Sequence, residues 1–384
     1  MTNPEMHGYV KMPVWDGHCH AMIYHKAEHT AELFRRIMKF YEYERITICA
    51  IINESDADHP ADNAVAFYVK SKLNAEKANS VYAFGNIEHY YDERDTADGY
   101  LEQVKMLLSM GADGIKLLDG KTADRKRLNR RLDDPVFDKM YAYLEENGVA
   151  ITTHIGDPRK NWDITQVSEY ARKKGWYYDE TYPTLDELYE EVDGVLEKFP
   201  KLKLNLAHFY FISDNYDAAV SMMEKWENVT FDLTPGGEMF EHFTKVPEKW
   251  RDFFIKYADR LTYGTDTYNF DAGEKLEDLD ASMPAGFRIN QVRTMLEKSE
   301  PFEDRVYGRL IPLNLDREVL EKIYYKNVKR NLGDAKPVNA ALASQYAAKM
   351  VGELENGVIK SGDGQKQALD MENLKFIRDY FASL

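Results

Sequence analysis

The sequence predicts an α/β protein: a distorted (β/α)8 TIM barrel followed by a C-terminal helical extension. Two observations carry this prediction. Short apolar, β-branched runs recur between residues 10 and 266, and segments with helical spacing separate them. Eight such repeats are the number at which a parallel sheet closes into a barrel. A doubly wound open sheet is the alternative. It is disfavoured because strand one lacks a following Gly-x-Gly-x-x-Gly turn and the sequence has no P-loop.

The expected strands are nearly continuous apolar runs, as in a parallel sheet that is covered on both faces. They are residues 10–20, 46–52, 81–87, 114–118, 149–154, 202–208, 229–233 and 261–266. The expected helices have apolar residues at helical spacing. They are residues 27–43, 61–79, 96–110, 134–147, 184–199, 214–227, 238–258 and 316–331. Gly148 and Pro200 end two of these helices, and Pro247 predicts a break in another.

Two long insertions and a C-terminal appendage complete the expected organisation. The insertions are residues 156–183 and 267–314, and the barrel domain is expected to span residues 1–335. Residues 336–384 form the extension, with two helices at 340–354 and 369–381. A packing or oligomer element is expected there, not a separate domain.

The composition is that of a soluble globular protein, with 44% hydrophobic residues, 30% charged residues and a net charge of −16. This charge disfavours nucleic acid and anionic membranes as partners. A small-molecule substrate is therefore the expected partner, and assembly into a homo-oligomer stays open. The N-terminal stretch lacks the apolar core of a signal peptide, and no apolar run is long enough to span a bilayer. Cys19 and Cys49 lie in apolar contexts and predict free thiols, so we expect a cytoplasmic protein.

The segment Val14-Trp-Asp-Gly-His-Cys-His20 ends the first expected strand. Residues two apart in a strand point to the same side, so His18 and His20 project together. Two neutral imidazoles aimed at one point can hold a divalent metal such as Zn²⁺. A chance His-x-His pair is the alternative, so the interpretation depends on partners at other strand ends.

Such partners occur at the ends of three later strands, where barrel enzymes carry their catalytic groups. They are His154 after strand five, His208 after strand six and Asp266 after strand eight. Taken singly, a strand-end histidine is more often a satisfied polar residue, and Asp266 could cap a helix. Convergence on one face of the barrel favours a metal site.

Lys116 lies within strand four between Ile115 and Leu117, so alternation points it into the barrel. A buried charge is costly unless it is paired or bound. Lys116 could instead extend to the barrel mouth.

Together, these residues resemble the amidohydrolase superfamily, and within it the amidohydrolase-2 branch of metal-dependent hydrolases and decarboxylases. The resemblance rests on Asp16-Gly-His-Cys-His20, Thr153-His-Ile-Gly156, Ala207-His208 and Tyr263-Gly-Thr-Asp266. The helix at 323–333 is similar to the Asn-Ala-x-Arg-Leu-Phe-Gly ending of that branch, with Val328 and Asn331-Leu332 as departures. The resemblance covers residues 12–333 and is specific for the fold and metal centre, not for the substrate.

The resemblance implies that His18, His20, His154 and Asp266 bind the metal. Zn²⁺ would lower the pKa of a bound water to about 7. Asp266 would also act as the general base and His208 would orient the attack. One ion is expected, with Lys116 as a catalytic pocket cation. If Lys116 is carbamylated, a second ion is expected, and His154 and His208 then shift to it.

Substrate contacts are assigned to the two insertions. Arg159 or Arg288 could hold a substrate carboxylate, with ordinary surface ion pairs as the alternative, and Tyr268 lies beside strand eight. The aromatic residues of 156–183 suit either a lid over an organic or sugar-like substrate or local packing.

Three functions are compatible with this set of residues. The first is hydrolysis of an amide, lactone or ester of a small carboxylate- or sugar-bearing compound. The second is non-oxidative decarboxylation of a small carboxylic acid, and the third is a non-catalytic metal- or ligand-binding barrel. The complete ligand set with His208 disfavours the third. By family analogy we expect a hydrolase.

Overall fold

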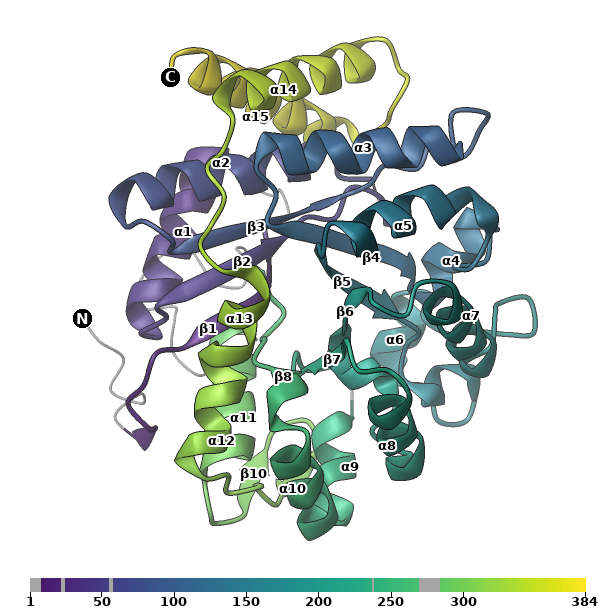
Figure 1. Ribbon diagram of the computed structural model, residues 1–384, viewed down its shortest axis with the longest axis vertical. Helices are drawn as coiled ribbons and strands as arrows, with labels where there is room; N and C mark the ends of the chain where they lie inside the picture. The colour runs from purple at the N-terminus through teal and green to yellow at the C-terminus, as the bar shows by residue number, and fades with distance from the viewer. Residues whose placement is uncertain (1–7, 22–24, 55–57, 237, 269–283) are drawn as a thin grey trace.

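The computed structural model describes residues 8–21, 25–54, 58–236, 238–268 and 284–384 (Figure 1). The main sheet is parallel, and its strand order is β8-β7-β6-β5-β4-β3-β2-β1-β9. The strands are β1 (Trp15–His20), β2 (Arg45–Cys49), β3 (Val81–Asn86), β4 (Gly114–Gly120), β5 (Ala150–Ile155), β6 (Lys203–Leu206), β7 (Val229–Asp232), β8 (Leu261–Thr262) and β9 (Thr267–Tyr268). From β1 to β8 each strand therefore pairs with its neighbour in sequence, as predicted for a barrel, and β9 pairs with β1.

The predicted eighth strand, residues 261–266, forms a strand only at β8, and β9 follows it at the start of the predicted insertion; both take part in closing the barrel. β8 pairs with β7, whereas β9 pairs with β1 in the register Cys19 to Thr267. Between them, the Gly17 N–H donates to the Tyr263 carbonyl and the Asp266 N–H to the His18 carbonyl, both at 3.0 Å. The first and last strands are thus neighbours along a seam. The predicted distorted (β/α)8 barrel is confirmed.

Helices surround the sheet (Figure 1). Within the described residues, the α-helices are α1 (Ala27–Phe40), α2 (Asp62–Glu76), α3 (Ala97–Met110), α4 (Thr122–Leu128), α5 (Asp138–Glu146), α6 (Glu169–Lys173), α7 (Leu185–Lys198), α8 (Tyr216–Lys225), α9 (Met239–Lys245), α10 (Pro247–Lys256), α11 (Pro284–Glu297), α12 (Arg317–Glu321), α13 (Asn327–Leu332), α14 (Ala340–Glu355) and α15 (Gly364–Ala382). The break predicted at Pro247 is confirmed, because α10 begins at that residue.

The two insertions contain structure that the sequence analysis missed. The first includes the short α6, and the second includes α11 and a hairpin of β10 (Phe302–Asp304) and β11 (Gly308–Leu310). α11 buries Ile289, Val292, Met295 and Leu296. This helical spacing was present in the sequence and could have predicted the helix.

The extension folds as two helices, which pack against α2 and α3 on one side of the barrel (Figure 1). The Tyr68 ring of α2 makes edge contacts with Phe376 and Tyr380 of α15, with ring centroids 5.4 Å and 4.9 Å apart. Asn63 donates a 3.1 Å hydrogen bond to the Tyr346 hydroxyl of α14. The extension therefore shares the apolar core of the barrel.

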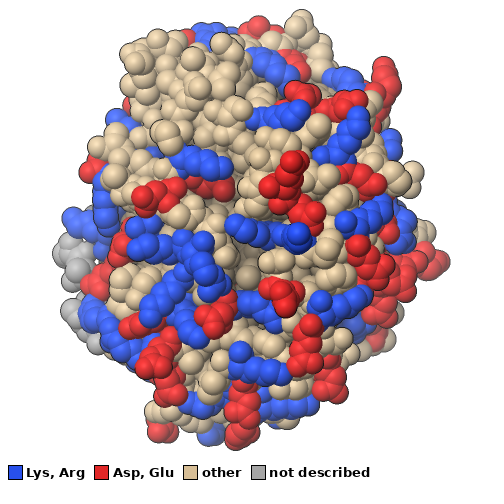
Figure 2. All heavy atoms as spheres, in the orientation of Figure 1, with Lys and Arg blue, Asp and Glu red and all other residues tan. Residues whose placement is uncertain are grey.

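Charged side chains of both signs are mixed over the face shown in Figure 2, so the net charge of −16 is not gathered in one patch there. Among the described residues, no helix has the length and apolar character of a membrane span.

Candidate metal centre

β1 places His18 and His20 side by side, with ring centroids 4.9 Å apart and both rings buried. A second contact fixes each ring. His18 Nδ1 lies 2.9 Å from Asp232 Oδ2, and His20 Nδ1 lies 2.7 Å from the Cys49 carbonyl oxygen. With Nδ1 engaged in both rings, Nε2 is the atom that each ring offers to a metal, as in protein metal sites where an acceptor orients the imidazole. In this structure the Nε2 atom of His18 lies near Lys116, and that of His20 lies near Asp266. Burial and the nearby Lys116 lower the pKa of His18 to about 3, so the ring is neutral at pH 7.

Asp266 completes a three-residue group with the two histidines. Each of the three offers one ligand atom, and these atoms lie within 4.8 Å of one another. Asp266 Oδ1 is 3.1 Å from His20 Nε2. Burial opposes ionisation of Asp266, but His20, His208 and His18 outweigh it and hold the pKa of the carboxyl well below its usual value. Two imidazoles and one carboxylate suit a divalent ion of the zinc type, so the donor set fits the expected metal.

The backbone at Asp266 explains why this carboxylate faces β1. Asp266 has a φ of 55°, in the left-handed region that L-residues other than Asn and Asp seldom adopt. The turn interrupts the eighth strand between β8 and β9. Its N–H donates to the His18 carbonyl across the seam, which ties the carboxylate to the histidine strand.

Asp232, at the end of β7, is the site residue that sequence reasoning missed. Its Oδ2 accepts from His18 Nδ1 and from Asn205 Nδ2 at 3.1 Å, and its Oδ1 accepts from the His208 N–H at 2.8 Å. Thr234 also donates to Oδ1 through its N–H and its hydroxyl. Burial opposes ionisation, but His18, His208 and Thr234 lower the pKa of Asp232 to about 2. The available signal was its position at a strand end.

His154 and His208 form a pair beside this group. His208 Nε2 lies 3.1 Å from His154 Nδ1, and His154 Nε2 lies 3.0 Å from the Gly156 carbonyl oxygen. The clustered ligand atoms are those of His18, His20 and Asp266, and His154, predicted as a ligand, is not part of this group. The His208 ring is 5.8 Å from that of His18, and its Nδ1 is buried without a hydrogen-bond partner among the described residues. Such an atom is costly to leave unpaired and is available to a bound water or substrate.

An unusual turn holds His208 in this place. Residues 208–211 follow β6 with φ values between 47° and 58°, all in the left-handed region. The turn ends β6 earlier than predicted, and it brings His208 against Gly236. A Cβ at residue 236 would lie 2.8 Å from His208 Cγ, so a side chain there would displace the imidazole.

Lys116 points into the barrel, as alternation predicted. It is buried, and its Nζ lies 3.2 Å from His18 Nε2. Burial lowers the pKa of the Lys116 ammonium below its usual value, although the nearby Cys49, Asp232 and Asp266 act in the other direction.

Of the three residues that the sequence assigned to substrate binding, two lie beside the metal group and one lies at the surface. Tyr268 stacks on His20 with centroids 4.9 Å apart, and Arg288 donates a 2.8 Å hydrogen bond to the Asp266 carbonyl. Arg159 is 47% exposed and pairs with Asp214 and Asp186. These are the surface ion pairs named as the alternative, and the substrate role of Arg159 stays a prediction.

Further charged pairs follow the ends of β2, β3 and β4. Lys121 Nζ pairs with Glu54 at 2.5 Å, and His89 Nε2 lies 2.8 Å from Asp119. Sequence reasoning missed both pairs, because the partners are far apart in the sequence. Glu54 and Lys121 are 67 positions apart, and His89 and Asp119 are 30 positions apart.

Comparison with known proteins agrees with this geometry. A family model described as amidohydrolase matches residues 89–333, a region that contains Lys116, His154, His208 and Asp266 but not β1. No curated protein sequence gives a significant match.

Solved structures share the fold at low sequence identity. An uncharacterised TIM-barrel protein from Bordetella bronchiseptica is 15% identical, with a TM-score of 0.52, over 86% of this chain and 99% of that one. A 2,6-dihydroxybenzoate decarboxylase bound to 2,6-dihydroxybenzoate is 12% identical, with a TM-score of 0.51, over 84% and 99%. IDCase from Metarhizium anisopliae is 14% identical, with a TM-score of 0.51, over 83% and 97%.

Proposed function

Because the chain belongs to the amidohydrolase family of metal-dependent enzymes, we propose that it is a hydrolase of small organic compounds. In this proposal, water attacks the carbonyl carbon of an amide, lactone or ester that carries a carboxylate or sugar group. The divalent ion, most simply Zn²⁺, supplies Lewis acidity that acidifies water and polarises the carbonyl.

One observation carries the proposal. His18, His20 and Asp266 present ligand atoms within 4.8 Å of one another, and Asp232 and the Cys49 carbonyl orient the two imidazoles. A group held in place by such partners loses little freedom on binding an ion, which favours a permanent site over an accidental cluster.

The remaining residues then have distinct tasks. Asp266, ionised at neutral pH, accepts the proton of the attacking water. His208, whose ring lies 5.8 Å from that of His18, would use its unpaired Nδ1 to orient the water or to stabilise the negative charge that develops on oxygen. Tyr268 and Arg288 border the site on its β9 side and contact the substrate.

A single ion is proposed, because the three clustered ligands include neither His154 nor His208. Lys116 would then be a cation that binds or polarises the substrate. Metal-to-protein stoichiometry, measured with and without bicarbonate, tests this. A ratio near one in both conditions supports one ion, and a ratio near two that falls in Lys116→Ala contradicts it.

Decarboxylation is the second candidate, and the buried Lys116 favours it. An ammonium 3.2 Å from His18 Nε2 could hold a substrate carboxylate next to the ion. The similarity in fold to a 2,6-dihydroxybenzoate decarboxylase is compatible with this but reaches only 12% identity.

One assay separates the two reactions. The metal-loaded enzyme is incubated with lactones, amides, esters and hydroxybenzoates, and both acid release and labelled carbon dioxide are measured. Acid release without carbon dioxide supports the hydrolase, and carbon dioxide release supports the decarboxylase. Asp266→Asn is the inactive control. Turnover that survives complete removal of metal would contradict both.

A further inference from the structure

A cavity lies beside the first residues of β5 and β6, one layer of side chains below the metal centre. Its volume is about 240 Å³. Its floor is formed by Thr152 of β5, Asn205 of β6, Thr230 of β7 and Thr262 of β8. Thr152 and Thr230 lie two residues before His154 and Asp232, so each pair faces the barrel interior. α13 covers the cavity with Val328, Arg330, Asn331 and Leu332.

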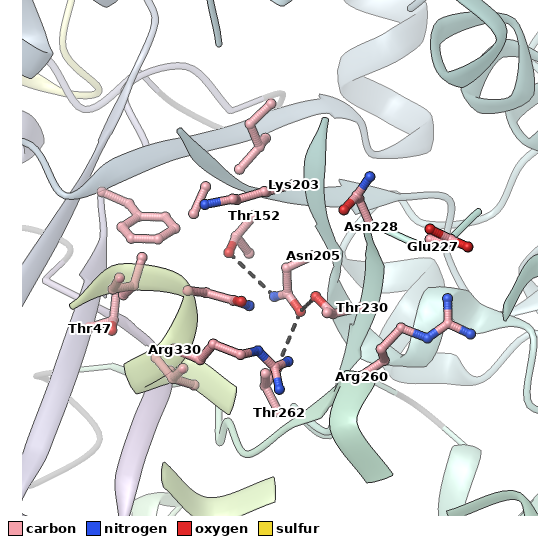
Figure 3. Close-up of a pocket in the computed structure, with 17 residues that line it drawn as sticks. Thr47, Thr152, Lys203, Asn205, Glu227, Asn228, Thr230, Arg260, Thr262 and Arg330 are labelled. Carbon is pink, nitrogen blue, oxygen red and sulfur yellow. Dashed lines mark hydrogen bonds between the residues drawn. The ribbon is translucent and has the colours of Figure 1, made fainter. Parts of the chain in front are cut away.

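The floor is polar where barrels usually carry bulky aliphatic side chains. Asn205 Oδ1 accepts from the Thr230 hydroxyl at 3.0 Å and from the Thr262 hydroxyl at 3.2 Å, and its Nδ2 donates to the Thr152 hydroxyl at 3.3 Å (Figure 3). The protons of Thr230 and Thr262 are thus used within the floor. Their oxygen lone pairs remain, so the floor suits a ligand that donates hydrogen bonds.

Whereas the floor suits a group that donates hydrogen bonds, the charged side chains around the cavity suit a negatively charged group. The charged side chains that line the cavity are three cations, Lys203, Arg260 and Arg330, and one anion, Glu227. Lys203 has no ion-pair partner among the described residues, and Arg260 donates to the carbonyl oxygens of Trp226 and Met223, which are neutral. Arg330 donates to the Asp259 carbonyl oxygen and lies 3.7 Å from the Asp259 carboxylate, an exposed ion pair that a ligand can replace. In a chain with a net charge of −16, such an excess of cations suits an anion.

The figures place these groups around one opening. In Figure 3 the Arg330 side chain extends toward Asn205 and Thr262, and Arg260 and Glu227 lie on the far side of the floor. In Figure 2 a recess near the middle of the face is bordered by Lys and Arg side chains. The cavity is therefore open to a ligand from solvent.

We propose that this cavity binds a small anion that also carries hydroxyl groups, such as a hydroxylated phosphate or carboxylate. The anionic group contacts Arg330, with Lys203 and Arg260 nearby, and the hydroxyl groups donate to the threonine oxygens of the floor. The volume of about 240 Å³ is below the range of about 300–1,000 Å³ for drug-sized ligands, which limits the ligand to a few carbon atoms. Asn205 of the floor also donates to Asp232 of the metal centre, so the two sites are neighbours, but the inference does not depend on the proposed hydrolase.

Calorimetric titration with glycerol 3-phosphate tests the proposal at constant ionic strength. The protein as purified should bind one equivalent. Arg330→Gln should weaken binding by about tenfold or more, the usual effect of losing a hydrogen bond to a charged group. The Arg330 side chain is 53% exposed, so this variant should fold. Arg378→Gln, which removes another exposed arginine, should bind like the wild type.

Three further binding measurements show where the ligand binds and which of its groups the protein recognises. Asp266→Asn should leave binding unchanged, and loss of binding in this variant would move the ligand to the metal centre and overturn the proposal. Thr230→Val should weaken the binding of glycerol 3-phosphate but not the binding of inorganic phosphate. Equally tight binding of inorganic phosphate to the wild type, wild-type affinity in Arg330→Gln, or no saturable binding would also overturn the proposal.

Discussion

A single buried carboxylate, Asp232, connects the two parts of the candidate metal centre. One of its oxygens contacts the ring of His18, and the other accepts from the backbone of His208. The same side chain therefore fixes the tautomer of one histidine and the position of another. Because Asp232 is ionised well below neutral pH, this arrangement persists over the whole working range of a neutral enzyme.

The Asp232→Asn variant tests this role. An amide keeps the size of the side chain but lacks the negative charge that stabilises the Nδ1–H tautomer of His18. We expect metal affinity to fall by about 10–100-fold, as for other residues that orient a metal ligand. Competition with a chromogenic chelator measures the affinity, and the exposed Asp217→Asn is the control. Unchanged metal affinity would show that Asp232 contributes only to packing.

His208 has a different role, and its variant should separate binding from turnover. Because His208 is outside the clustered ligands, His208→Ala should keep the metal and lower kcat by about 10²–10⁴-fold. Elemental analysis and steady-state kinetics give the two quantities. His242→Ala, which removes a partly buried histidine that contacts Ser213, should change neither. Loss of metal in His208→Ala would instead identify His208 as a ligand.

The sequence allowed part of this centre to be predicted. Period-two alternation predicted that His18 and His20 share a face, because that relation is local. Strand-end positions predicted that Asp266 meets them. The pairing of His154 with His208 and the role of Asp232 were not predictable, because they depend on side-chain orientations set by the turn at 208–211 and by distant partners.

At the scale of elements, the turn after β6 shows how local backbone geometry positions a functional group. Four consecutive residues with left-handed φ cost conformational energy, so the surrounding packing must hold them. Gly236 permits this packing by lacking a side chain where His208 lies. The sequence contains Pro-Gly-Gly at 235–237 but gives no sign of the residue that packs there.

Gly236→Ala should therefore impair the site through His208. The added methyl group forces the imidazole away, so we expect kcat to fall and the free energy of unfolding to decrease by about 1–3 kcal/mol. Urea unfolding measures the free energy of unfolding, and steady-state kinetics measure kcat. Gly352→Ala in α14 is the control, because a Cβ there has nothing within 4 Å and alanine favours a helix. Normal kcat in Gly236→Ala would mean that the turn adjusts freely.

The loops after β2 and β4 are joined by the Glu54–Lys121 ion pair. Burial alone would raise the pKa of Glu54, but Lys121 and the nearby His59 outweigh it and hold the pKa well below the usual value. A carboxyl group with a lowered folded-state pKa stabilises the protein above its unfolded-state pKa of about 4.3 and loses this contribution as the pH falls.

Glu54→Gln should therefore lose stability at pH 7 and approach the wild type at low pH. Chemical denaturation at pH 7, 4 and 3 measures the difference in the free energy of unfolding between the two proteins, which should be nearly constant above about pH 4.3 and narrow below it. Glu303→Gln, in β10, is the control. A difference that is constant with pH would show that Glu54 acts without its charge.

For the whole molecule, the order of strands and helices was predictable because each repeat has its own apolar pattern. The division of the eighth strand was not, because it depends on how the last strand meets the first. The candidate metal ligands lie across this seam: His18 and His20 are on β1, and Asp266 lies between β8 and β9. A bound ion would thus join the two ends of the sheet.

Removal of the metal should loosen the seam before the rest of the barrel. We expect hydrogen exchange to increase in residues 15–20 and 261–268, with little change in β4 to β6, because local opening follows the loss of local contacts. Exchange measured by mass spectrometry with and without a chelator tests this. His20→Ala should match the metal-free wild type, and a uniform increase over the barrel would contradict the prediction.

The seam also determines when the centre can exist during synthesis of the chain. Asp16 and Thr265 hydrogen-bond across it, although 249 positions separate them in sequence. At a translation rate of about 5–20 residues per second, the histidine strand leaves the ribosome about 12–50 s before its aspartate partner. During this interval the nascent chain has two imidazoles and no carboxylate to complete the set. The complete set of three ligands therefore exists only after the last strand has been synthesised.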